Sequence, residues 1–163
     1  MNVRSLLDFL RFLRRNKGFL VGFSMLIVFL VLAFGISYYS PYDPRRWNTA
    51  PRDIPPSWNH PFGTTTLGQD LFWLLTWALR NSLIIGFIGS IIGLAIGAFL
   101  GFIAGYKGGI LDRAIILVSD IFIAIPLLMP IILIGSIIKT QLNIGFLGIL
   151  FGVFTWGMPV RNV

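Results

Sequence analysis

Four long apolar stretches, separated by short polar segments, follow one another along the chain. They run from about Gly18 to Tyr39, from Ser82 to Tyr106, from Ala114 to Ile138 and from Ile144 to about Pro159. The first three exceed the roughly 20 residues that a helix needs to cross the hydrocarbon core of a bilayer, and the fourth is marginal. Because a helix satisfies its own backbone hydrogen bonds in lipid, the pattern predicts an all-α membrane protein with polytopic transmembrane helices.

In the second stretch, glycine recurs at every fourth position. The five residues are Gly89, Gly93, Gly97, Gly101 and Gly105. Small residues at this spacing let membrane helices approach one another closely, so we predict that this ladder packs against other helices. Successive fourth positions advance about 40° around a helix, and five of them sweep about 160°. Such an arc is wide for one straight seam and suits more than one neighbouring helix, or one that wraps around the span.

The polar segments divide the chain into four predicted parts. These are an interfacial helix over residues 1–17, a first span over 18–39, an outer proline-rich loop with its own interfacial helix over 40–81, and a core with three further spans over 82–163. Residues 1–17 combine basic side chains with apolar residues at helical spacing, as in helices that lie on the cytoplasmic leaflet. A disordered basic tail is the alternative for this segment.

The segment between the first two spans predicts both a loop and a helix start. It holds six of the nine prolines, which forbid a long helix or a central strand and favour an extended loop. Thr66 and Gln69 then match a capping box, with Thr66 as N-cap. We therefore expect a helix over residues 67–80 that lies at the outer interface and leads into the second span.

Composition and charge narrow the class of protein. Hydrophobic residues make up 56% of the 163 residues and charged ones 12%, so a soluble domain of this size could not bury its apolar surface. Five of the thirteen basic residues precede the first span, which is the cytoplasmic bias of membrane proteins. The basic residues before the first span therefore predict a multi-pass membrane protein with a cytoplasmic N-terminus, and no nucleic-acid partner is expected.

The residues that carry common enzyme chemistry are scarce. The chain has no cysteine, no glutamate and a single histidine, His60, so the usual metal sites and catalytic triads are not expected. It also lacks the GxxxxGK[ST] pattern of a phosphate-binding loop. We therefore expect a non-catalytic chain without a cofactor or a metal.

Four residues near or inside the spans are candidates for function. Asp120 lies within the third span, where an ionisable group is costly, so it should face protein or water. It either makes a helix-packing hydrogen bond or lies near a substrate path. Pro126 and Pro130 lie four residues apart in the same span, and predict either a hinged helix that lines a pathway or a static kink. Arg80, at the outer edge of the second span, is either an interface anchor or a substrate contact.

An ordered set of motifs over about 100 residues resembles a known family of membrane proteins. The set comprises His60-Pro61-Phe62-Gly63-Thr64, Leu67-Gly68, Asp70, Arg80, Ser82-Leu83, Ala104-Gly105-Tyr106, Gly108-Gly109, Asp112, Asp120, Pro126, Trp156 and Arg161. It is similar to the inner-membrane permease subunits of ABC importers of the dipeptide and oligopeptide class, in particular their C-type chain. The resemblance implies a permease that forms part of a translocation path for peptides or a related solute such as oligosaccharides.

The resemblance also implies partners. These are a homologous permease subunit, two cytoplasmic ATPase subunits that hydrolyse ATP, an extracytoplasmic substrate-binding protein and the lipid bilayer around the spans. The family's ATPase-coupling loop and two further spans would follow Val163, so we expect a permease fold that is incomplete at the C-terminus. The alternative function is a non-transporting helical scaffold or assembly protein that associates through its glycines. A channel is a weaker alternative, because the spans hold almost no polar ring residues.

Overall fold

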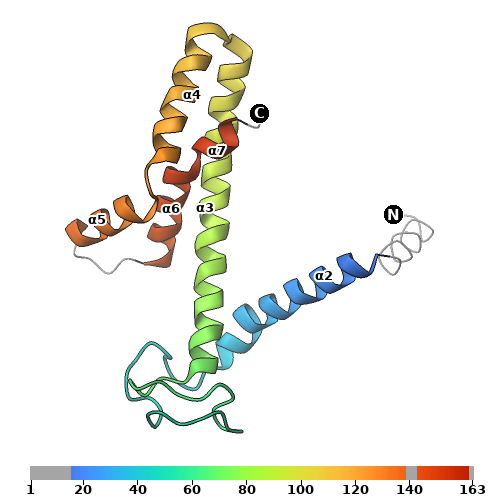
Figure 1. Ribbon diagram of the computed structural model, residues 1–163, viewed down its shortest axis with the longest axis vertical. Coiled ribbons are helices and arrows are strands. Elements are labelled where there is room, and N and C mark those ends of the chain that lie inside the picture. Colours follow the sequence, from blue (N-terminus) through green and yellow to red (C-terminus); the bar gives the residue numbers. More distant parts are fainter. Residues whose placement is uncertain (1–15, 139–142, 162–163) are drawn as a thin grey trace. The chain divides into compact units, whose positions relative to one another are not determined.

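The computed structural model describes residues 16–138 and 143–161, and these residues are mainly helical (Figure 1). In place of a strand, the described chain has one isolated bridge, between Thr64 and Asp70. The chain separates into two compact units, Met1–Arg80 and Asn81–Val163. Of the interfacial helix predicted over residues 1–17, residues 1–15 lie outside the described part of the chain.

The first unit contains the first span. Helix α2, Lys17–Leu30, continues through a π-helical turn, Val31–Gly35, and a 3₁₀ turn, Ile36–Tyr39. Together they form 23 helical residues that are long and apolar enough to cross a membrane, as predicted. Nearly all of the side chains of α2 are exposed within the chain, as expected for a helix that contacts lipid or other subunits.

The predicted capping box is wrong, because the chain forms a turn where the helix was expected to begin. Gly68 has a positive φ of 69°, and its N–H donates to the Thr65 carbonyl at 2.9 Å. Helix α3 begins only at Leu71, and its cap is Asp70, whose Oδ1 accepts a hydrogen bond from Phe72 N at 2.9 Å. Only glycine adopts this left-handed conformation freely, so Gly68 prevents a helix from starting at residue 67.

Helix α3 also replaces the two separate helices that were predicted. It runs without interruption over 37 residues, Leu71–Lys107, which corresponds to about 55 Å. The predicted interfacial helix is therefore continuous with the second span, and its position at the outer interface stays a prediction. The boundary between the two units falls inside α3, after Arg80.

The second unit contains the rest of α3 and four shorter helices. They are α4, Gly109–Ala124; α5, Leu128–Ile138; α6, Ile144–Thr155; and α7, Gly157–Val160. Gly108 and Gly109, with φ of 59° and 64°, make the tight turn between α3 and α4. Asn143 caps α6, because its Oδ1 accepts from Phe146 N at 2.7 Å.

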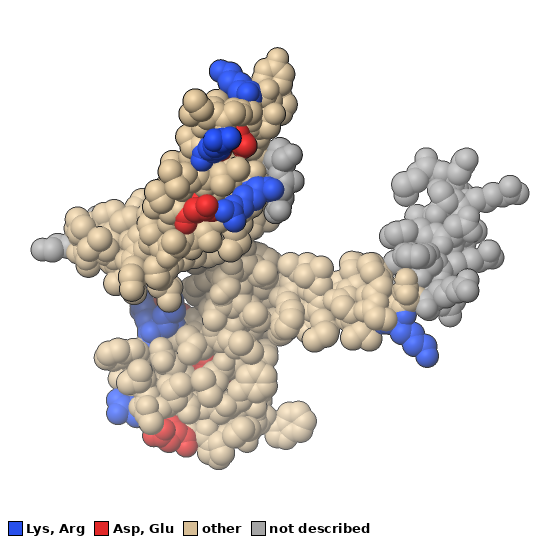
Figure 2. Space-filling view, turned by 45° about the horizontal axis from the view of Figure 1, so that its top comes forward, with Lys and Arg blue, Asp and Glu red and all other residues tan. Residues whose placement is uncertain are grey.

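The predicted third span is broken in the middle. Helices α4 and α5 are bent by 75° at residues 125–127, so the described chain has two membrane-crossing helices, or three if α4 and α5 form one span. The predicted fourth stretch is shorter than a full span and is divided into α6 and α7. Charged side chains form only small islands on the face shown in Figure 2, as expected where helices are surrounded by lipid.

Candidate functional site

The glycine ladder of α3 faces α6 and α7. The neighbours nearest to an added Cβ are Phe151 for Gly89, Thr155 for Gly93 and Pro159 for Gly97, at 2.6, 3.1 and 2.6 Å. Gly101 is also buried. Gly105 is exposed and has no described neighbour within 4 Å of that position, so it does not extend the seam. Within the described chain, the contacted glycines therefore meet one neighbour, the α6–α7 segment.

The opposite side of this seam is also made of glycines, which the sequence reasoning missed. A Cβ at Gly148 would lie 2.8 Å from Ile88 Cβ, and one at Gly152 would lie 2.6 Å from Ile92 Cβ. Both glycines are buried. Each side of the interface thus offers glycines where the other offers a larger side chain, so the backbones approach closely. The four-residue spacing of Gly148 and Gly152 was the signal that could have revealed the second half of the seam.

The contacts along this seam, the interface of α3 with α6 and α7, show that the helices run parallel. They also show at which level along α3 the interface lies. Gly89, Gly93 and Gly97 meet residues of increasing number on α6 and α7. Gly93 lies 12 residues after Asn81 and 14 residues before Lys107. At 1.5 Å per residue these separations are about 18 and 21 Å, so Gly93 and its neighbour Thr155 lie near the middle of the apolar part of α3.

The break between α4 and α5 lies beside the middle of the seam. Helix α4 ends at Ala124, and Pro126 has no N–H to donate to the carbonyl of Phe122. Helix α5 begins two residues later, and Pro130 occupies its first turn, where a missing N–H costs no intrahelical bond. The break therefore forms at Pro126, and Pro130 adds no second one.

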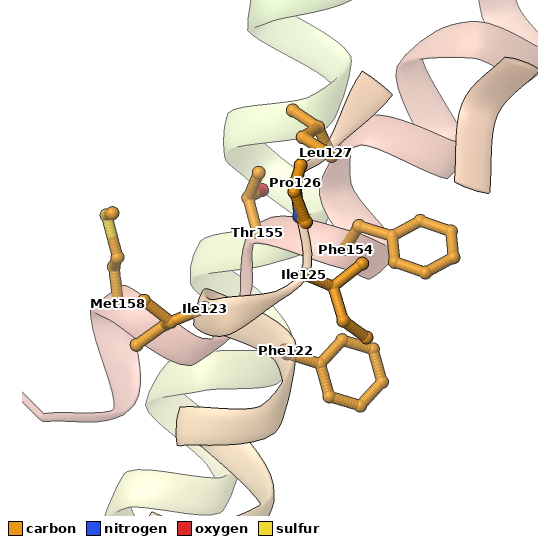
Figure 3. Close-up of a pocket in the computed structure, with 8 residues that line it drawn as sticks. All are labelled: Phe122, Ile123, Ile125, Pro126, Leu127, Phe154, Thr155 and Met158. Atoms are coloured by element: carbon orange, nitrogen blue, oxygen red, sulfur yellow. The ribbon is translucent and has the colours of Figure 1, made fainter. Parts of the chain in front are cut away.

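An apolar pocket of about 260 Å³ lies at this break (Figure 3). Its lining comes from the end of α4 and the break on one side, and from α6 and α7 on the other: Phe122, Ile123, Ile125, Pro126, Leu127, Phe154, Thr155 and Met158. The Phe122 and Phe154 rings lie 6.0 Å apart. Because Thr155 also faces Gly93, the pocket lies at the middle depth of α3.

Next to the pocket, α7 packs closely against the last turns of α4. A Cβ at Gly157 would lie 2.8 Å from the Ser119 carbonyl oxygen, and the rings of Phe122 and Trp156 are 5.1 Å apart. Asp120, the candidate in the third span, forms an ion pair with Arg161, which follows α7. The structure thus pairs two charges that lie 41 residues apart in sequence.

In the first unit, the carboxylate of Asp70 joins three segments of the chain. Its side chain is fully buried, and Oδ1 caps α3 through Phe72 N. Oδ2 lies 2.7 Å from His60 Nδ1 and accepts from the Tyr42 hydroxyl at 3.3 Å. Burial and the Asp70 carboxylate raise the pKa of Tyr42 to about 12. His60 therefore helps to hold the outer loop to the start of α3.

Two arginines of the first unit lie near the ring of Trp77. Arg45 lies 5.0 Å and Arg80 lies 5.9 Å from the centroid of the Trp77 ring, within the range of cation–π contacts. Arg45 also donates to both carboxylate oxygens of Asp43, at 2.9 and 2.8 Å. The hydrogen bond from Arg45 lowers the pKa of Asp43 to about 2. Arg80 is thus held by an aromatic ring, and its role as anchor or substrate contact stays a prediction.

The second unit is characterised by its shape and packing. Among the described residues there is no group of three or more His, Cys, Asp or Glu side chains that could hold a metal ion. The distinctive features of this unit, within the described residues, are the broken span, the apolar pocket and the Asp120–Arg161 ion pair. Whether Asp120 and Pro126 line a pathway stays a prediction, and so does a hinge at Pro126.

Comparison with known proteins finds similarity to transport permeases. Residues 5–60 match the family model for the N-terminal transmembrane domain of oligopeptide transport permease C. The chain is 33% identical over 141 residues to the dipeptide transport system permease protein DppC of Haemophilus influenzae, covering 83% of this chain and 48% of that protein. It is 37% identical over 134 residues to the oligopeptide transport system permease protein OppC of Bacillus subtilis, covering 82% and 43%.

A third relative extends the match over most of the chain. The oligopeptide transport system permease protein OppC of Mycobacterium tuberculosis (strain H37Rv) is 32% identical over 155 residues, which is 94% of this chain and 52% of that protein. The chain spans about half the length of the curated relatives it matches.

Proposed function

Because the chain belongs to the family of C-type dipeptide and oligopeptide transport permeases, we propose that it forms part of the translocation path of an ATP-driven importer. The solute is a peptide or a related molecule such as an oligosaccharide. The partners are a homologous permease subunit, two cytoplasmic ATPase subunits and an extracytoplasmic substrate-binding protein. The chain itself is not catalytic, so ATP is hydrolysed by the ATPase subunits.

The observation that carries this proposal is the broken span at middle depth. A membrane helix that breaks at Pro126 leaves backbone groups without intrahelical partners, and lipid cannot satisfy them. Such a break is tolerated where it faces protein or a water-filled cavity, and transporters place their solute sites at interrupted helices near the bilayer midplane. The pocket beside Pro126 supports the same interpretation.

A scaffold function is supported less well. It relied on a glycine ladder free to bind another protein, whereas Gly89, Gly93 and Gly97 face α6 and α7 of the same chain. The surface that would recruit a partner in this way is therefore already occupied over most of its length.

Uptake by cells tests the proposed function. A strain in which the corresponding gene is deleted should lose uptake of radiolabelled trialanine and regain it with the intact gene, while uptake of free alanine stays unchanged. A labelled oligosaccharide serves as the second solute. If the deletion strain takes up both solutes at the parental rate, the transport function is wrong.

The orientation is tested by labelling single cysteines, since the chain has none of its own. Ala50→Cys should react with an impermeant thiol reagent added outside intact cells, and Lys107→Cys should react only after the cells are opened. The reverse pattern would contradict a cytoplasmic N-terminus followed by an outer loop.

A further inference from the structure

We infer that Asp120 and Arg161 are a positioning pair that sets the distance between the two walls of the pocket at the broken span. The inference rests on the proposed function, because it assigns the pair a role in selecting the transported solute by size. Asp120 belongs to α4, which supplies one wall of the pocket. Arg161 follows α7, which supplies part of the other wall. The ion pair joins these two elements directly.

The position of the pair explains why it would control this distance. Asp120 lies between Ser119, whose carbonyl meets Gly157, and Phe122, whose ring meets Trp156. These contacts fall in the last two turns of α4, immediately before the chain bends by 75°. Helix α4 ends at Ala124, so its contacts with α6 and α7 hold its end in place, and the Asp120–Arg161 pair is the charged one among them.

The chemistry of the pair makes it sensitive to the loss of either partner. Both side chains are about half exposed within the chain, at 47% for Asp120 and 48% for Arg161. Within the described residues, each has the other as its charged partner. An unpaired charge at membrane depth draws water or moves towards the interface. Removing one charge should therefore loosen the contact more than removing both, since the double neutral variant leaves no unpaired group.

The walls can be followed with two cysteines, because the chain has none of its own. Ile123 comes from α4 and Met158 from α7, and both line the pocket (Figure 3). In the full gene product, Ile123→Cys with Met158→Cys should be cross-linked fastest by a short bifunctional thiol reagent. Adding Asp120→Asn should slow this reaction at least about threefold and favour a longer reagent. The double variant D120N/R161Q and the charge swap D120R/R161D should each recover part of the original rate.

Asp112→Asn is the matched control, because Asp112 lies on the first turn of the same helix and has no ion pair among the described residues. It should leave cross-linking unchanged. The inference is overturned if D120N cross-links as fast as this control at equal protein in the membrane. It is also overturned if neither double variant improves on D120N.

A transport assay then distinguishes a role of the pair in solute selection from a role in stability alone. For uptake of tripeptides with increasingly large side chains, D120N should change the ratio of rates between large and small peptides, and the charge swap should move that ratio back. If cross-linking shifts while the size ratio stays constant, the pair is structural and the role in selection is refuted. If the unaltered protein transports no peptide, the proposed function fails, while cross-linking still reports on the pair.

Discussion

The seam between α3 and α6 predicts a large difference between two glycine-to-alanine substitutions. In Gly152→Ala the new Cβ would lie 2.6 Å from Ile92 Cβ and 2.8 Å from the Gly89 carbonyl oxygen. Carbon atoms in contact normally lie about 3.5–4.0 Å apart, so the helices must separate by about 1 Å. Neither neighbour can rotate away, because one is backbone and the other is the first atom of a branched side chain.

The cost of this separation can be estimated. A gap of about 0.5–1 Å removes roughly a quarter to a half of the dispersion energy of each contact along the seam. Overpacking of this kind costs about 1–3 kcal/mol in the free energy of unfolding. Gly86→Ala is the matched control, since Gly86 lies on α3 with nothing within 4 Å of an added Cβ. It should be neutral or stabilising by up to about 1 kcal/mol, because alanine favours helix.

Unfolding in mixed micelles measures both variants. The purified protein is titrated from dodecylmaltoside into sodium dodecyl sulfate and followed by tryptophan fluorescence, which reports on five tryptophans including the buried Trp156. Gly152→Ala should unfold at a lower fraction of dodecyl sulfate than Gly86→Ala. If Gly152→Ala is as stable as Gly86→Ala, the helices are not in close contact and the seam is wrong.

Further predictions concern the outer unit and the break. The hydrogen bond from Arg45 lowers the pKa of Asp43 from 3.8 to about 2, so the ionised carboxylate stabilises the first unit fully above pH 3.8. This contribution is lost as the pH falls from 3.8 towards 2. Asp43→Asn should remove this loss of stability, as measured by tryptophan fluorescence during acid unfolding. Burial raises the pKa of Tyr42 from 10.0 to about 12, so the neutral hydroxyl stabilises the folded state fully below pH 10. This contribution should be lost as the pH rises from 10 to 12. Tyr42→Phe should remove this alkaline loss of stability, as measured by unfolding followed with circular dichroism. Asp70→Asn keeps an oxygen that can cap α3 but removes the buried charge that His60 and Tyr42 contact, and should cost about 1–3 kcal/mol in the same mixed-micelle unfolding; an unchanged midpoint would show that the carboxylate does not hold the outer loop to α3. Pro126→Ala restores a backbone donor and should straighten the bend, lengthening the distance between spin labels on α4 and α5, whereas an unchanged distance would show that packing alone holds the bend.

Local pattern was sufficient for much of the helical architecture. The apolar stretches located the first span and the core of α3, because in lipid every backbone group must bond within its own helix, and length and hydropathy then decide where a span can form. Pro126 correctly indicated an interruption of the third span, because a missing N–H is a property of the residue itself. The start of α3 was misjudged, because Gly68 and Asp70 form a turn and a cap that compete with the capping-box pattern.

The pairing of distant residues was decided by the tertiary structure. The glycines of the ladder, such as Gly89, predicted a helix face made of small residues. Which helix packs against that face depends on the rotation and depth of α6 in the membrane, and contact with lipid alone fixes neither of them. In the same way Asp120 was recognisable as a costly charge, whereas its pairing with Arg161 required α7 to return to α4. The sequence alone determined which segments enter the membrane, because that depends on each segment's own backbone and apolar length. Only the folded chain decided which faces meet, because close packing depends on the shapes of two surfaces at once.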